Sequence, residues 1–355
     1  MVTGILFFFF WFVGLKAQLF LIPSLMVTGV KSVIHHTPSV AELPIIDPSK
    51  LARGDDAELE RLFDAGKTHG FFYLDLTTAE TPRLVDTLNA VLAFMAEYFD
   101  QPREAKMKDN RKSDIHGYEP CGTSAGATED RTDHYESLKI SFQECRTRSD
   151  NLAPASNAHG LTMLILRCLT KVLGEKLPTP LESFHDPSRP TTSTLSMFRY
   201  PSQIGEEAAK GVGHNKHTVI GTLTFLLCQQ WGLQVLSPQQ NKWVYVAPKH
   251  GHAIIVVGDS LRFLTQNRLL STVHRVLLFI NRQLDHRYSI SFFLRPADDT
   301  IYRDSKGRMI TAREWHDQKF DHFRVSHSEQ AGDSILTGGM EQADKINASV
   351  LVGGE

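Results

Sequence analysis

Short apolar runs dominate the second half of the chain. They are rich in β-branched and aromatic residues and occupy residues 193–200, 219–227, 233–236, 243–246, 253–257, 270–280 and 288–294. Runs that recur about every ten residues, with no long helix between them, are typical of an antiparallel sandwich or barrel rather than a parallel α/β sheet. We therefore predict that this half is mainly β.

The first half has another pattern, because its apolar residues recur at three- and four-residue steps. Residues 55–69 and 161–173 read as helices, and residues 82–99 place one apolar face along a longer helix. Short strands are predicted at 43–47 and 70–74. We expect these helices to flank the β core and to bury their apolar faces against it.

The N-terminus carries an apolar extension over residues 1–29. Its stretch 5–26 is long enough to cross a bilayer, although it contains Lys16 and Pro23. The first four residues recur from Met26 onward. We interpret the extension either as an imperfect membrane anchor or as an addition made by the gene model.

Composition limits the kinds of partner and the cellular compartment that we expect. The 355 residues are 41% apolar and 22% charged, with a formal net charge of −2 and no long basic block. This charge balance provides no basic patch that would bind nucleic acid, so we expect a small-molecule substrate. The four cysteines form no Cys-x-x-Cys pair and indicate neither a zinc site nor a disulfide framework. We predict a cytoplasmic protein, with membrane association through residues 5–26 as the alternative.

The candidate chemistry lies on three of the predicted strands. His217 begins one strand, His274 follows in a second after 274 − 217 = 57 residues, and Arg287 and Ser289 begin a third. Alternate side chains of a strand share a face, so Arg287 and Ser289 point the same way, as do His217 and Val219.

This order and spacing resemble the Fe(II)- and 2-oxoglutarate-dependent oxygenases, in the branch that includes isopenicillin N synthase. The segments Gly70-Phe-Phe, Gly232-Leu-Gln-Val and Gly258-Asp strengthen the resemblance, which extends from about residue 40 to 325. It implies a mainly β fold with flanking helices around a double-stranded β-helix, or jelly roll.

The resemblance also implies a site. In the family, two histidines and an aspartate bind Fe(II), and 2-oxoglutarate chelates the same ion as co-substrate. The metal ligands would then be His217 and His274, and the 2-oxoglutarate contacts Tyr200, Arg287 and Ser289. The arginine would bind the far carboxylate with its forked donors. No catalytic side chain beyond the metal centre is implied.

The chain departs from the family at one ligand, because Val219 stands where the family has its aspartate. Halogenating relatives also lack this carboxylate, but they have Ala or Gly there, which leaves room for chloride. Valine fills that room. Asp259 could offer a replacement carboxylate, but the family uses that residue in a turn, so we do not assign it to the metal.

The same resemblance divides the chain. It implies a helical N-terminal region at 38–185, the jelly roll at 186–298 and a C-terminal segment at 299–325. The polar zone 101–157 would form the mouth of the site. Residues 326–355 are small and polar with Gly-Gly pairs, and we predict a disordered tail.

Two functions stay open. The first is an oxygenase that hydroxylates, desaturates or cyclises a small molecule of the secondary-metabolite kind. The second, motivated by Val219, is a non-oxidative isomerase or cyclase, or a catalytically inactive partner subunit that supports a paralogous oxygenase.

Overall fold

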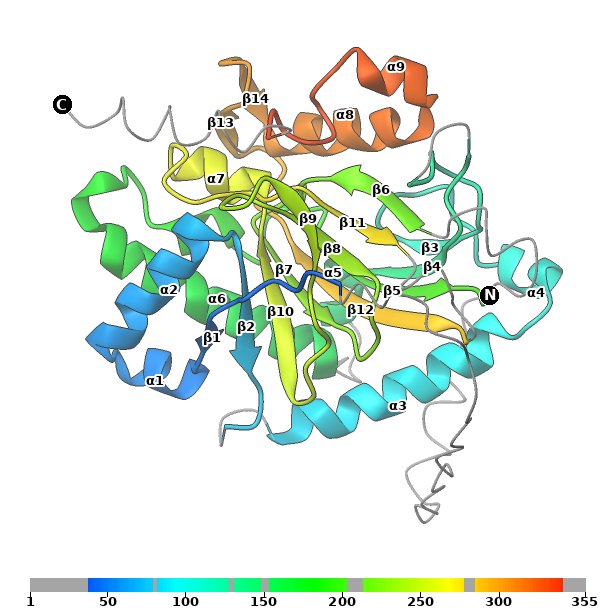
Figure 1. Cartoon of the computed structure of the whole chain (residues 1–355), viewed down its shortest axis with the longest axis horizontal. Coiled ribbons are helices and arrows are strands. Elements are labelled where there is room, and N and C mark those ends of the chain that lie inside the picture. The colour runs from blue at the N-terminus through cyan, green and yellow to red at the C-terminus, as the bar shows by residue number, and fades with distance from the viewer. Residues whose placement is uncertain are drawn as a thin grey trace, which may run out of the picture. The chain divides into compact units, whose positions relative to one another are not determined.

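Two facing sheets form the centre of the protein, as a computed structural model shows (Figure 1). The structure describes residues 38–78, 82–127, 131–147, 153–202, 213–277 and 285–340; the predicted extension at 1–29 lies outside them, as do the side chains of residues 82–87 and 153–154. In the order in which the strands pair, the large sheet consists of β1 (Ile45–Ile46), β2 (Phe71–Asp75), β10 (His252–Val257), β7 (Leu223–Leu227), β12 (Arg287–Leu294), β5 (Thr194–Tyr200), β4 (Glu136–Ser141) and β3 (Gly117–Glu119). The small sheet consists of β6 (Gly213–His217), β11 (His274–Leu277), β8 (Leu233–Ser237) and β9 (Lys242–Tyr245).

Neighbouring strands pair antiparallel in both sheets, apart from the short parallel pair β1 and β2. The two sheets have the jelly-roll arrangement predicted for the second half. A separate hairpin, β13 (Ile301–Arg303) with β14 (Met309–Thr311), follows the sheets.

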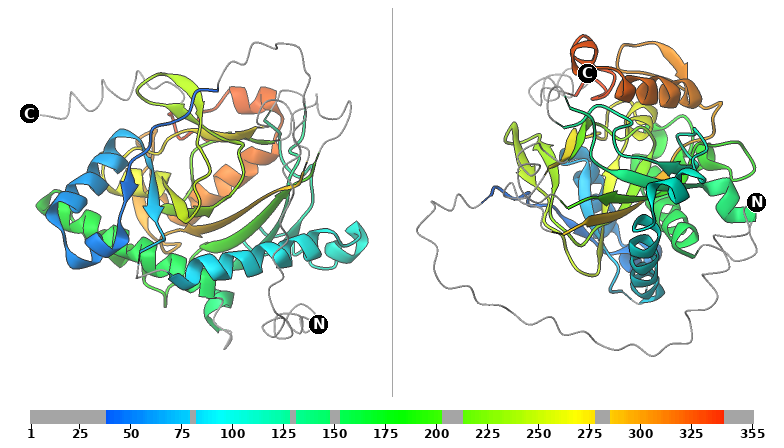
Figure 2. Two further views of the ribbon diagram at one scale, coloured as in Figure 1. Left: turned by 60° about the horizontal axis from the view of Figure 1, so that its bottom comes forward. Right: turned by 90° about the vertical axis from the view of Figure 1, so that its right-hand side faces the viewer.

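Helices flank this core. The longer ones are α2 (Asp56–Thr68), α3 (Pro82–Phe99), α6 (Ala153–Leu173) and α8 (Ala312–Arg324), and the shorter ones are α1 (Pro48–Arg53), α4 (Arg103–Met107), α5 (Phe142–Thr147), α7 (Asp259–Leu264) and α9 (His327–Ala331). Figures 1 and 2 show α2, α3 and α6 on the outer side of the large sheet, where their apolar faces join one buried cluster with it. Each fully buried side chain of this kind contributes about 1.5–3 kcal/mol.

Alternation along the strands separates that outer layer from the interior. On β10, Ile255 belongs to the cluster under the helices, whereas Ile254 and Val256 belong to the cluster between the sheets. On β2, Phe71 is likewise buried between the sheets. Because successive side chains of a strand face opposite sides, the central strands of the large sheet are apolar on both faces.

The predicted strand at 219–227 is shorter in the structure. β6 ends at His217, and the chain bends over residues 218–222 before β7 begins at Leu223. A side chain at Gly221 would meet the carbonyl oxygen of Leu294 at 2.6 Å, so only glycine fits in the bend. The bend carries the chain from the small sheet to the large one, a change of direction that β-branched composition alone does not predict.

The prediction of a disordered tail from residue 326 is wrong for residues 327–340. Ser326 and Glu329 form a reciprocal capping box that begins α9. Leu336 and Met340 are then buried against the rest of the protein. These contacts fix a segment whose composition is typical of disorder. Residues 341–355 lie outside the described part.

In the described part of the chain, no helix combines the length and the apolar character that a membrane span requires.

Candidate active site

The two predicted metal ligands lie opposite each other on neighbouring strands of the small sheet. His274 on β11 pairs in register with His217 at the end of β6, and the centres of their rings are 4.2 Å apart. Nδ1 of His217 is 2.7 Å from the carbonyl oxygen of Asn215, and Nδ1 of His274 is 3.2 Å from that of Thr272. A carbonyl only accepts, so in each neutral ring Nδ1 carries the proton and Nε2 keeps the lone pair that a metal needs.

The protein keeps both rings neutral. Burial lowers the pKa of His274 to about 4 and the pKa of His217 to well below its usual value. The other ring lowers the pKa of His217 further, and Lys319 disfavours a proton on either ring. Both imidazoles are therefore unprotonated at neutral pH, which is the form that coordinates metal ions.

Val219, where the sequence comparison with the family predicts an aspartate, offers only methyl groups. Its side chain is 4% exposed and belongs to the apolar cluster between the sheets, with Phe71 and Val235 among others. Within the described residues, no three or more His, Cys, Asp or Glu side chains are arranged to hold a metal ion. The chain thus offers two imidazoles and, from its described part, no anionic ligand.

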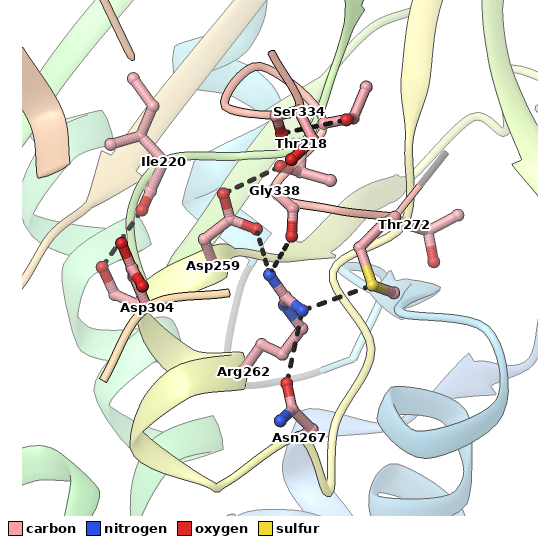
Figure 3. Close-up of polar contacts among 12 residues, drawn as sticks. Thr218, Ile220, Asp259, Arg262, Asn267, Thr272, Asp304, Ser334 and Gly338 are labelled. Carbon is pink, nitrogen blue, oxygen red and sulfur yellow. Dashed lines mark hydrogen bonds and ion pairs between the residues drawn. The ribbon is translucent and has the colours of Figure 1, made fainter. Parts of the chain in front are cut away.

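Asp259 is committed to a buried ion pair. Its Oδ2 accepts from Lys319 Nζ at 2.6 Å and from Thr218 Oγ1 at 2.8 Å, and both charged side chains are fully buried. Figure 3 shows this carboxylate between Thr218 and Arg262, whose guanidinium also reaches the carbonyl oxygen of Gly338 at 2.6 Å. Asp259 therefore stabilises the turn that follows His217, through Thr218 and Lys319.

The same contacts fix the backbone that follows His217. The Thr218 carbonyl accepts from Lys319 Nζ at 2.9 Å, and the Thr218 N–H donates to the carbonyl of Leu336 at 2.9 Å. The N–H of Asp259 donates to the carbonyl of Val219 at 2.7 Å. Segments from α7, α8 and the residues after α9 therefore hold the turn in place.

The predicted 2-oxoglutarate contacts meet where β12 pairs with β5. Arg287 is directly opposite Tyr200, and its guanidinium lies 4.8 Å from the centre of that ring. Ser289 is buried two residues further along the same face. Sequence reasoning missed two neighbours, since Arg287 Nε donates to the carbonyl of Trp231 at 3.0 Å and Nη2 contacts Cys228 Sγ at 3.1 Å.

Arg287 retains an unused donor. Its side chain is 4% exposed, and the described residues place no hydrogen-bond partner on its buried Nη1 and no carboxylate within ion-pair distance of the guanidinium. A buried cation with a free donor favours an anionic ligand, because burying an unpaired charge is costly. The arginine therefore fits the far carboxylate of 2-oxoglutarate.

A pocket opens beside the histidines. It encloses about 610 Å³ of empty space, part of it open to solvent, and it is lined by Asp114, Glu119, Ser124, Tyr135, Lys139, Thr194, Ser196, Phe198, His214, His217, Val219, Ile220, Phe293, Arg295, Phe320 and Phe323. The lining residues come from the N-terminal region, β5, β12 and α8, and their meeting depends on the fold.

His214 lines the pocket, although the sequence did not indicate it as part of the site. Its ring stacks on Tyr135 at 4.7 Å and on His217 at 4.5 Å, and burial lowers its pKa to about 3. Strand alternation would not have found it, because three residues along a regular strand place the two rings on opposite faces. The pairing of β6 with β11 is irregular at this point, which brings both rings to one side.

Comparisons with known proteins agree with this geometry. Residues 192–296 match the 2OG-Fe(II) oxygenase superfamily, and residues 43–157 match the N-terminal region described as non-haem dioxygenase in morphine synthesis. The chain is 48% identical over 314 residues to the 2-oxoglutarate-dependent dioxygenase frbH of a Dothideomycetidae species, covering 85% of this chain and 97% of that one. It is 42% identical to the 2-oxoglutarate-dependent dioxygenase gloE of Glarea lozoyensis, covering 86% and 95%.

A solved structure supports the fold. The dioxygenase for auxin oxidation of rice superposes with a TM-score of 0.62 at 22% identity, covering 83% of this chain and 99% of that one. The chain belongs to the 2-oxoglutarate- and Fe(II)-dependent oxygenase superfamily. Its function is accordingly that of a dioxygenase-type oxidoreductase acting on small molecules.

Proposed function

We propose that His217 and His274 bind Fe(II) and that Val219 occupies the position of the family's aspartate, within the isopenicillin N synthase-like branch. The observation that carries the proposal is the pair of neutral imidazoles 4.2 Å apart, each with its Nδ1 held by a carbonyl. With Fe(II) and 2-oxoglutarate bound, such a site supplies the oxidising power to break an unactivated C–H bond.

Arg287, Tyr200 and Ser289 bind 2-oxoglutarate in this proposal. The free Nη1 of Arg287 receives the far carboxylate, while the contacts of Nε with Trp231 and of Nη2 with Cys228 hold the guanidinium in one orientation. Fixing the donors before the ligand arrives reduces the entropy cost of binding.

Val219 makes metal binding depend on the co-substrate. Losing even a neighbour of a metal ligand typically lowers affinity ~10–100-fold, and losing an anionic ligand should lower it at least as much. The carboxylate of 2-oxoglutarate returns a negative charge to the ion. The two imidazoles alone therefore bind Fe(II) weakly, and the complex with 2-oxoglutarate binds it tightly.

Anaerobic Fe(II) titration with and without 2-oxoglutarate tests this coupling, with His274→Gln as the control that removes one imidazole. We expect stoichiometric binding of iron only when the native protein also has 2-oxoglutarate, and much weaker binding by His274→Gln. Equal iron affinity with and without 2-oxoglutarate would contradict the coupling. Absence of binding under both conditions would contradict the metal site itself.

The substrate in this proposal is a small molecule of the secondary-metabolite kind, which is hydroxylated, desaturated or cyclised in the cytoplasm. The fungal relatives that are named 2-oxoglutarate-dependent dioxygenases support this view. The family matches at 43–157 and 192–296 support a division into a helical N-terminal region at 38–185 and a jelly roll at 186–298. In this proposal a C-terminal segment at 299–325 follows the jelly roll.

A second candidate rests on the surroundings of Val219. A valine inside an apolar cluster and an Asp259 committed to Lys319 suit a cavity that works without metal, as an isomerase or cyclase or as the inactive partner of a paralogous oxygenase. Succinate formation from 2-oxoglutarate, measured over a panel of small molecules at saturating Fe(II), separates the two. Turnover favours the oxygenase, and stoichiometric iron in the complex with 2-oxoglutarate contradicts the metal-free alternative.

A further inference from the structure

The pocket beside the histidines combines aromatic walls with buried charge. Tyr135 and Phe198 lie 5.6 Å apart between ring centres, and Phe198 and Phe293 lie 6.4 Å apart. Phe320 and Phe323, from α8, close another side. Rings in these positions offer flat faces and edges to a ligand, and they favour a conjugated or aromatic partner.

Most charges that line this pocket already have partners. The Glu119 carboxylate accepts from Lys139 Nζ at 2.8 Å, and Asp114 pairs with Arg324. Arg295 differs, because none of the ion pairs found among the described residues includes it and its buried Nε has no hydrogen-bond partner there. Arg295 is therefore a lining cation without a direct ion pair among the described residues, and the carboxylates of Asp114 and Asp298 act on it only from a distance.

Arg295 is held toward the pocket. Its Nη1 donates to the Thr192 carbonyl, and its guanidinium lies 5.2 Å from the centre of the Phe293 ring and 6.0 Å from that of Phe320. The side chain is 5% exposed, and burial lowers its pKa to about 10. A group with that pKa still carries its charge at neutral pH, so the site is a preformed anion receptor.

Arg295 and Arg287 lie at opposite ends of the same extended segment. They are eight residues apart, so their side chains leave the same face of the sheet, and the strand separates them by about 26 Å. His214 and His217 line the pocket that Arg295 also lines, whereas Arg287 is not among its lining residues. One arginine can therefore receive the co-substrate while the other receives a second anion.

We infer that the pocket selects a flat, conjugated substrate with an anionic group, either a carboxylate or an ionised enol or phenol, and that Arg295 binds this group. The inference rests on the proposed function, since it assigns the pocket to the molecule that is oxidised. It names the chemical class that the relatives' names leave open.

Binding of 2-naphthoate and its neutral analogue 2-naphthamide tests this, by calorimetry on protein saturated with Mn(II) and 2-oxoglutarate. We expect native protein to prefer the acid on the order of 10- to 100-fold, the strength of one or two charge-assisted hydrogen bonds. Arg295→Gln should lose the preference and Arg295→Lys should keep most of it. Arg303→Gln, at an exposed arginine on β13, is the matched control and should bind as the native protein does.

Equal binding of the two compounds, a preference that survives in Arg295→Gln, or no saturable binding of the acid at millimolar concentration would overturn the inference. Arg287→Leu separates it from the proposed function, because this variant should lose 2-oxoglutarate and retain the preference for naphthoate. If the preference disappears in Arg287→Leu instead, the carboxylate binds in the co-substrate site. If native protein binds naphthoate through Arg295 but never binds 2-oxoglutarate, the proposed function fails and the pocket assignment stands.

Discussion

Replacing Val219 by aspartate is the sharpest test of the metal site, because it restores the family's ligand at one position. Without metal, the variant should lose stability. Burying a valine contributes about 1.5–3 kcal/mol, and the new carboxyl would lie in an apolar cluster at a cost of about 1–3 kcal/mol more. The sum, about 2.5–6 kcal/mol, corresponds to a fall in Tm of about 3–8 °C for a chain of 355 residues, because the unfolding entropy is ~2.1 cal/mol/K per residue.

The carboxyl of Val219→Asp should also show its burial through pH. Desolvation raises its folded-state pKa above the value in the unfolded chain, so the protonated form is favoured in the fold. Metal-free variant should therefore be most stable, relative to native protein, at acid pH and should lose that stability as pH rises through the folded-state pKa. Thermal melts across a pH series measure this trend.

Binding of Fe(II) should reverse the loss of stability in Val219→Asp. A ligand present at 100 times its Kd stabilises the folded state by about 2.7 kcal/mol, so saturating Fe(II) under anaerobic conditions should recover much of the Tm. Val219→Asn is the matched control, because it has the shape of aspartate without the charge. If iron raises the Tm of Val219→Asp no more than that of Val219→Asn, the two histidines do not form the metal site that we propose.

Three further predictions concern other parts of the protein. Arg287→Leu should lower 2-oxoglutarate affinity on the order of 100-fold with an unchanged Tm, measured by calorimetry and thermal melts, and unaltered affinity would assign the arginine to another ligand. Lys319→Met should lower the free energy of unfolding in urea by about 3–5 kcal/mol, because it leaves the Asp259 charge buried and unpaired. Adding Asp259→Asn should recover part of this free energy. A loss under ~1 kcal/mol would show that the pair is not buried in solution. Burial lowers the pKa of His185 to about 3. The free energy of unfolding should therefore fall as pH drops from the unfolded-state pKa of ~6.5 toward that value, and the fall should be smaller in His185→Gln. An identical pH dependence in this variant would exclude His185 as its source.

The sequence allowed the jelly roll to be predicted, because the periodicity of the second half is local and strong. The approach of His217 to His274 was also expected, since each lies at a strand position defined by spacing and by a family motif. That Arg287 and Tyr200 lie close together was expected for the same reason, and the structure pairs them directly across two strands. The metal and co-substrate roles of these residues stay predictions.

Other features depend on contacts that local pattern does not encode. Lys319 and Asp259 are 60 residues apart, and the sequence around either residue does not indicate that the two form an ion pair. Phe320 lies on an amphipathic helix and lines the pocket only because α8 packs across it. The bend at Gly221 depends on the approach of Leu294 from another strand.

The contact between Thr218 and Leu336 has a consequence for how the protein is made. The two residues are 118 positions apart, and the turn that follows His217 is bonded to the later one. During synthesis this turn emerges long before its partner, so the site is finished only when residues 333–340 have left the ribosome. A chain interrupted earlier would contain both histidines and all the strands of the jelly roll, but the geometry of its metal-binding turn would be incomplete.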